Sequence, residues 1–119
     1  MSAFLWPGVP VFDIRATAGM TDMLVRNSNL GRALAQTLGP RPTALMRGHG
    51  GVVVGDTLPQ VVFRAVYTEM NARLQAQAMA LGGSVTYLDP EEARKAEASV
   101  GGTVSRPWEL WKRRAMSRP

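Results

Sequence analysis

The stretch from Thr43 to Asp56, TALMRGHGGVVVGD, constrains the fold of this chain more than any other. A short apolar run gives way to three glycines that bracket the only histidine, His49, and a run of valines follows. Glycine permits backbone conformations that other residues avoid, and consecutive valines are typical of a buried strand. The pattern predicts two strands that hold one imidazole at a sheet edge or a bulge.

Two residues of this stretch are candidate site residues, and each has a simpler alternative. His49 is either a metal ligand or a loop histidine without a role. Arg47 is either a surface charge or a residue that binds a carboxylate or phosphate group through bidentate hydrogen bonds. One histidine cannot hold a catalytic metal alone, because a catalytic zinc site takes three protein ligands and an open position.

Composition bounds the protein class. The 119 residues predict one domain over 1–119, with 45% hydrophobic and 19% charged residues. The net charge of +5 does not indicate a nucleic-acid partner, because the only dense basic cluster lies at the C-terminus. There is no cysteine, no secretory signal and no apolar run long enough for a membrane span. We therefore expect a cytoplasmic protein without a membrane partner.

The remaining elements follow from breakers, caps and periodicity. Residues 1–8 are apolar but interrupted by proline and glycine, which predicts an extended arm. The other expected elements are a strand over 9–15, helices over 29–38, 58–81 and 90–98, and a basic C-terminal helix within 104–119. Strands and helices are thus both expected along the chain.

Three further residues have two interpretations each. Asp13, beside Arg15 at the end of the first strand, is either solvated or has a substrate or ion-pair role near a site. Glu69 falls in the apolar stripe of the long helix, where an acid is buried at a cost. It is either a structural glutamate that pairs with an arginine or caps a loop, or an acid that supports the site or contacts the substrate. Tyr67, beside that stripe, is a packing residue or a second supporting residue.

Five segments in order carry a family resemblance: VPVFDIR, TDMLVRN with LGRALAQTLG, LMRGHGGVVVG, VVFRAVYTEMNARLQAQAMALG and VTYLDPEEA. Over about residues 10–98 they resemble the C-terminal half of the class II aldolase/adducin-like family. The resemblance is strongest to its decarboxylase branch, whose members act on aromatic or pyridine carboxylates and ring-opened semialdehydes.

The resemblance implies a partial three-layer α/β/α fold with a mainly antiparallel sheet and with the N-terminal half missing. Members of the family are homo-oligomers, often tetramers, that bind zinc or manganese through three histidines. His49 corresponds to one of these ligands, while the HxH pair and the catalytic acid belong to the other half, so no catalytic residue is assigned here. Arg47 stands where sugar-cleaving members have asparagine, which favours a small carboxylate substrate.

Two functions follow from this resemblance. The first is a metal-dependent carbon–carbon lyase, a decarboxylase or aldolase rather than a sugar-phosphate epimerase, that needs the missing half. The second is an inactive remnant or oligomerisation module, held together through the apolar arm and the C-terminal tryptophans.

Overall fold

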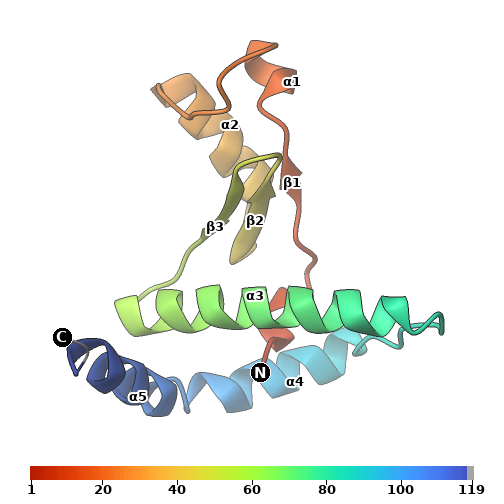
Figure 1. The fold of residues 1–119 in the computed structure, drawn as a ribbon, viewed down its shortest axis with the longest axis vertical. Coiled ribbons are helices and arrows are strands. Elements are labelled where there is room, and N and C mark those ends of the chain that lie inside the picture. Colours follow the sequence, from red (N-terminus) through yellow and green to blue (C-terminus); the bar gives the residue numbers. More distant parts are fainter. Residues whose placement is uncertain (118–119) are drawn as a thin grey trace. The chain divides into compact units, whose positions relative to one another are not determined.

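The computed structural model describes residues 1–117, in which the chain forms two compact units. That residues 1–119 belong to one domain stays a prediction. The sheet unit comprises Pro7–Val54, and the helical unit comprises Met1–Trp6 together with the chain from Gly55 onward (Figure 1). Each unit has its own packed interior and is described by itself.

The sheet unit contains a three-stranded sheet of order β1-β2-β3. Its strands are β1 (Val11–Phe12), β2 (Thr43–Met46) and β3 (Gly50–Val53). β1 and β2 are parallel, and β2 and β3 are antiparallel. The expected mainly antiparallel sheet is therefore wrong for the described residues, since the sheet is mixed. The physical reason is the connection: two helices separate β1 from β2 and return the chain in the same direction, whereas a tight turn joins β2 to β3.

Two helices of this unit lie between β1 and β2: α1 (Arg15–Ala18) and α2 (Ser28–Leu38). α2 matches the expected helix closely because its start is encoded locally: the Asn27 side chain accepts a hydrogen bond from the Leu30 N–H. Leu30 packs with Phe12 and Ile14 in the core of the unit. On the opposite side of the sheet, Val11 and its register partner Leu45 are exposed.

The helical unit is built on α3 (Leu58–Ala80), followed by α4 (Pro90–Gly101) and α5 (Ser105–Met116). The bounds of α3 agree with the expected helix, and the Thr57 hydroxyl caps it by accepting from the Gln60 N–H. α4 begins with a capping box between Asp89 and Glu92. α5 lies within the expected C-terminal helix, of which Arg118 and Pro119 fall outside the described residues.

The expected extended arm contains a short 3₁₀-helix, η1 (Ala3–Leu5), which packs against α4. Ala3 and Phe4 are buried there, because an apolar segment gains more from covering α4 than from extending into water. Aromatic rings continue the packing along α3, with centroid separations of 6.4 Å for Phe4–Phe63 and 4.5 Å for Phe63–Tyr67. Within residues 1–117, no helix is both long and apolar enough to cross a membrane.

Candidate functional site

The candidate site lies in the sheet unit, at the edge where β1 and β2 both end. The parallel register pairs Phe12 with Met46, so Asp13 and Arg47 leave the sheet side by side. The Arg47 N–H donates to the Phe12 carbonyl at 3.0 Å, which extends the ladder by one bond. Ligands of open α/β sheets bind at the carboxyl ends of parallel strands, so this edge is a suitable place for a site.

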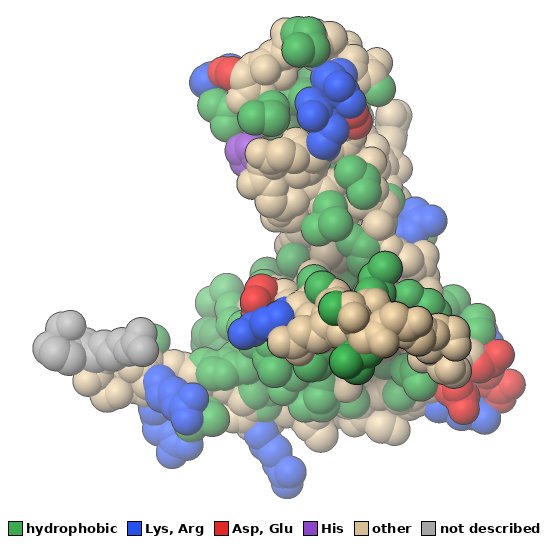
Figure 2. Space-filling model, turned by 45° about the vertical axis from the view of Figure 1, so that its right-hand side comes forward, with side chains coloured by type: hydrophobic (Ala, Val, Ile, Leu, Met, Phe, Trp, Pro, Cys, Tyr) green, Lys and Arg blue, Asp and Glu red, His purple; other side chains and the backbone are tan. Residues whose placement is uncertain are grey.

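Arg47, Gly48 and His49 form the three-residue turn between β2 and β3. The His49 N–H donates to the Met46 carbonyl at 3.0 Å and closes the turn. Gly48 has a φ of +69°, a left-handed conformation that a residue with a Cβ adopts only at a cost. The prediction of strand, glycine-bracketed histidine and strand is confirmed, and its form is a hairpin turn. The His49 side chain is exposed (Figure 2, purple).

A cluster of charges fixes Arg47 to the end of β1. Asp13 accepts bonds from Arg15 at 2.6 Å (Nη2) and at 3.0 and 3.1 Å (Nε), and another from the Arg15 backbone N–H at 3.1 Å. Its Oδ1 also lies 3.2 Å from the Nε of Arg47. The side-chain hydrogen bonds from Arg15 are the main reason that the pKa of Asp13 lies well below its usual value. Partial loss of hydration acts in the opposite direction and raises this pKa. Of the two interpretations of Asp13, the structure supports the ion pair.

An open depression of about 460 Å³ borders Asp13 on the side of α1 and α2. Thr17, Gln36 and Thr37 contribute polar atoms to its lining, while Phe12 and Ala33 contribute apolar surface. Its volume is in the range of ligand pockets. Neither Arg47 nor His49 lines it, so the depression adjoins the charged cluster rather than containing the candidate residues.

The described residues do not form a metal site by themselves. Across residues 1–117 there is no group of three or more histidine, cysteine, aspartate or glutamate side chains that could hold a metal ion. His49 is the only imidazole of the chain, and the Asp13 carboxylate is already engaged by two arginines. A catalytic metal would therefore need ligands from outside this chain.

The other two candidate residues belong to α3, in the helical unit. Glu69 has an exposed side chain and pairs with Arg73 at 2.8 Å, so its predicted burial is wrong while its predicted pairing with an arginine is confirmed. Tyr67 packs between Phe63, at 4.5 Å, and Trp111, at 6.2 Å. Both side chains therefore have partners within the helical unit. A supporting role beside His49 stays a prediction for each of them.

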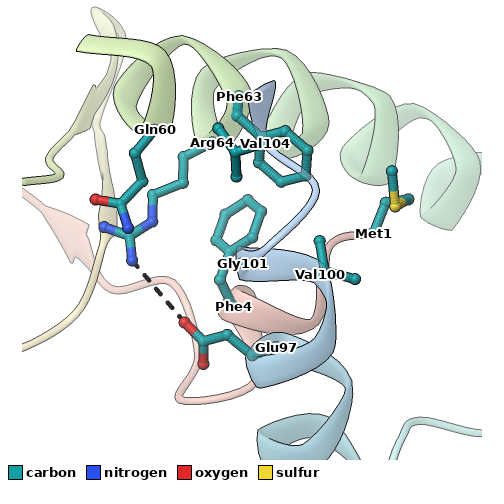
Figure 3. Close-up of a pocket in the computed structure, with 9 residues that line it drawn as sticks. All are labelled: Met1, Phe4, Gln60, Phe63, Arg64, Glu97, Val100, Gly101 and Val104. Atoms are coloured by element: carbon teal, nitrogen blue, oxygen red, sulfur yellow. Dashed lines mark ion pairs between the residues drawn. The ribbon is translucent and has the colours of Figure 1, made fainter. Parts of the chain in front are cut away.

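The helical unit also contains a small cavity of about 70 Å³ (Figure 3). Phe4 and Phe63 face it, and the ion pair between Arg64 and Glu97, at 3.9 Å, lies at its edge. A cavity of about 150 Å³ is known to accommodate benzene, so this one is too small for an aromatic carboxylate. We do not assign it to the substrate.

Sequence reasoning did not identify Arg15, or the pairing of Asp13 with Arg47. The motif DIR at the end of an expected strand was a signal for an ion pair between neighbours. The contact with Arg47 depends on the parallel register of β1 and β2, which is a non-local property that no local pattern encodes.

Comparison with known proteins identifies relatives of the chain. The model of the family described as "Class II Aldolase and Adducin N-terminal domain" matches residues 6–76.

Decarboxylase tropJ of Talaromyces stipitatus is 34% identical over 134 residues, which cover 95% of this chain and 50% of the relative. Two proteins named 3,4-dihydroxyphthalate decarboxylase are also similar. The one from Terrabacter sp. is 34% identical over 71% of this chain and 33% of its own length. The one from Arthrobacter keyseri is 30% identical over 82% of this chain and 36% of its own length. The chain thus spans half or less of the length of each of these relatives.

Proposed function

This chain belongs to the class II aldolase and adducin family, and we propose that it forms part of a decarboxylase that acts on an aromatic carboxylate. The proposal extends to this chain the chemistry that its relatives' names describe. The family resemblance read from the motifs is confirmed, whereas the substrate and the activity are proposals.

One observation carries the proposal: the turn Arg47–Gly48–His49 is fixed at the edge where two parallel strands end. There Arg47 would bind a substrate carboxylate, because a guanidinium presents two parallel donors that match the two carboxylate oxygens. His49, two residues further along, would supply an imidazole to the same site.

The chemistry of decarboxylation indicates which carboxylate Arg47 would hold. The departing carboxylate loses its charge as carbon dioxide forms, so a cation paired with it stabilises the ground state more than the transition state and slows the reaction. An arginine that assists the reaction therefore binds a second carboxylate, which the product retains. We propose that the substrate is an aromatic dicarboxylate, in which one group is anchored and the neighbouring group is lost.

We further propose that His49 is one ligand of a divalent metal, zinc or manganese, whose role would be to accept electron density from the breaking bond. The remaining ligands would come from polypeptide outside these 119 residues, either the rest of a longer protein or another subunit of a homo-oligomer. Glu69 and Tyr67 stay candidates for supporting that assembled site.

The test is carbon dioxide release from 3,4-dihydroxyphthalate with zinc or manganese present. The chain is assayed alone and after mixing with the part of Decarboxylase tropJ that it does not match. We expect release only from the mixture, with loss in His49→Ala and no loss in Arg32→Ala, an exposed arginine of α2. Equal release from the mixture that contains His49→Ala would contradict the role of His49.

A second candidate function, an assembly module without catalysis, is favoured by one observation. α3 and the residue after it expose Leu74, Met79 and Leu81, which are 61%, 61% and 87% accessible. Figure 2 shows hydrophobic side chains over the helical unit. Exposed apolar surface is typical of an interface. Sedimentation velocity tests this function. An oligomer that dissociates in the Leu74→Lys variant supports it, and a monomer at all concentrations contradicts it.

A further inference from the structure

We infer that Asp13 is the positioning residue of Arg47: it holds the Nε edge of the guanidinium and leaves the two terminal nitrogens available for a substrate carboxylate. What Arg47 binds rests on the proposed function. The orientation of Arg47 is a property of the free chain and can be tested separately.

The Nε atom makes the shortest contact between the Arg47 guanidinium and Asp13. The Nε of Arg47 lies 3.2 Å from the Oδ1 of Asp13. Within residues 1–117, no side-chain hydrogen bond to another residue is found for the terminal nitrogens of Arg47, whose shortest contact with Asp13 is through Nε. These two nitrogens form the end of the fork that binds a carboxylate through two parallel bonds. Asp13 therefore occupies the part of Arg47 that such binding does not need.

Asp13 is itself held in place, which makes it a fixed reference for Arg47. The guanidinium of Arg15 binds both of its oxygens, with the shortest contact at 2.6 Å, and the Arg15 backbone N–H binds Oδ1. The backbone of Arg47 is tied to the same strand end through the Phe12 carbonyl, at 3.0 Å. Both ends of the Asp13–Arg47 contact are thus anchored to β1, and the long arginine side chain loses freedom before any ligand arrives.

Two other roles for Asp13 fit the structure less well. A proton acceptor is one of them, but the lowered pKa keeps the carboxylate ionised and makes it a weak base near neutral pH. A contribution to folding is the other, but the Asp13 and Arg47 side chains are 33% and 42% exposed, and exposed ion pairs contribute little to stability. Orienting the Arg47 side chain is therefore the role of Asp13 that fits the geometry best.

Charge complicates a simple binding test. Two arginines share one carboxylate here, so the cluster is cationic. Replacing Asp13 by asparagine adds positive charge and by itself strengthens the attraction of an anion. The loss of orientation acts in the opposite direction, so the two effects must be separated by measuring each substitution with and without Arg47.

The first experiment follows the Nε–H of Arg47 by heteronuclear NOE in the full chain. We expect an ordered signal in the wild type and a mobile one in Asp13→Asn. Asp22→Asn is the matched control, because it breaks a similar pair with Arg26 in the same unit and should leave Arg47 ordered. Unchanged exchange of the Leu45 amide would show that β1 and β2 remain paired. Equal order of Arg47 in the wild type and in Asp13→Asn would overturn the inference.

The second experiment titrates phthalate, as a dicarboxylate probe, into the wild type, Asp13→Asn, Arg47→Ala and the double variant. Immobilising one long side chain corresponds to a coupling of about two- to tenfold in the dissociation constant. Asp13→Asn changes the dissociation constant of phthalate both in the wild type and in Arg47→Ala. We expect the change towards weaker binding to be larger by this factor when Arg47 is present. The same effect in both backgrounds would overturn the inference. If phthalate does not bind the wild type at all, the carboxylate anchor of the proposed function fails, and the NOE still decides the role of Asp13.

Discussion

Gly48→Ala is the most informative single change in the turn that carries Arg47 and His49. Gly48 has a φ of +69°, and a left-handed backbone costs an ordinary residue about 1–2 kcal/mol. The added methyl carbon would also lie 3.0 Å from the Sδ of Met23, at the flexible part of a side chain that can move aside. The backbone term therefore dominates, and we expect a loss of about 1–2 kcal/mol in the free energy of unfolding of the sheet unit.

Hydrogen exchange of the Leu45 amide measures this loss within the sheet unit. The Leu45 N–H donates to the Pro10 carbonyl at 2.8 Å and is released only when β1 and β2 separate. A loss of this size corresponds to exchange about 5–30-fold faster in Gly48→Ala than in the wild type. Tryptophan fluorescence would not report it, because all three tryptophans belong to the helical unit.

Gly31→Ala is the matched control. Gly31 lies in α2 of the same unit, and a Cβ there would meet nothing within 4 Å. Replacing a helical glycine by alanine stabilises by roughly 0.5–1 kcal/mol, so exchange of the same amide should become slower. If Gly48→Ala also slows exchange or leaves it unchanged, the left-handed turn is refuted, and with it the placement of His49.

Three other changes test separate parts of the structure. The pKa of Asp13 is lowered in the folded state, so the unfolded state binds more protons. The small stabilisation from its exposed ion pairs is complete above pH 3.8 and is lost progressively as the pH falls below it; a ¹³C titration of its carboxyl with a midpoint at or above 3.8 would contradict this. Asp89→Ala removes the capping box with Glu92 and should cost about 0.5–2 kcal/mol, seen as a lower urea midpoint by circular dichroism, while an unchanged midpoint would exclude the cap. Phe63→Ala removes a 3%-exposed ring and should cost about 3–5 kcal/mol by tryptophan fluorescence; a cost below 1 kcal/mol would place Phe63 outside the core.

Features encoded by neighbouring residues were predictable from the sequence. Asn27, Thr57 and Asp89 cap three helices that were expected from the sequence, and their side-chain bonds reach only two or three residues along the chain. The turn at His49 was predictable for the same reason, since Gly48 supplies the conformation that it needs.

Features that depend on distant contacts were not predictable. The parallel pairing of Phe12 with Met46 joins residues 34 positions apart, and it alone brings Asp13 to Arg47. The predicted burial of Glu69 failed because α3 has apolar residues on more than one face, so periodicity does not define a single buried stripe. Leu74, which the same helix exposes, shows this directly.

The central claim is that Arg47, at the end of the parallel strand pair, binds a carboxylate. The most direct measurement is a phthalate titration of the full chain followed by ¹H–¹⁵N NMR. We expect shifts centred on Arg47 and His49, much weaker binding in Arg47→Ala, and unchanged binding in Arg32→Ala. Equal affinity in the wild type and in Arg47→Ala would contradict the claim and remove Arg47 from the site.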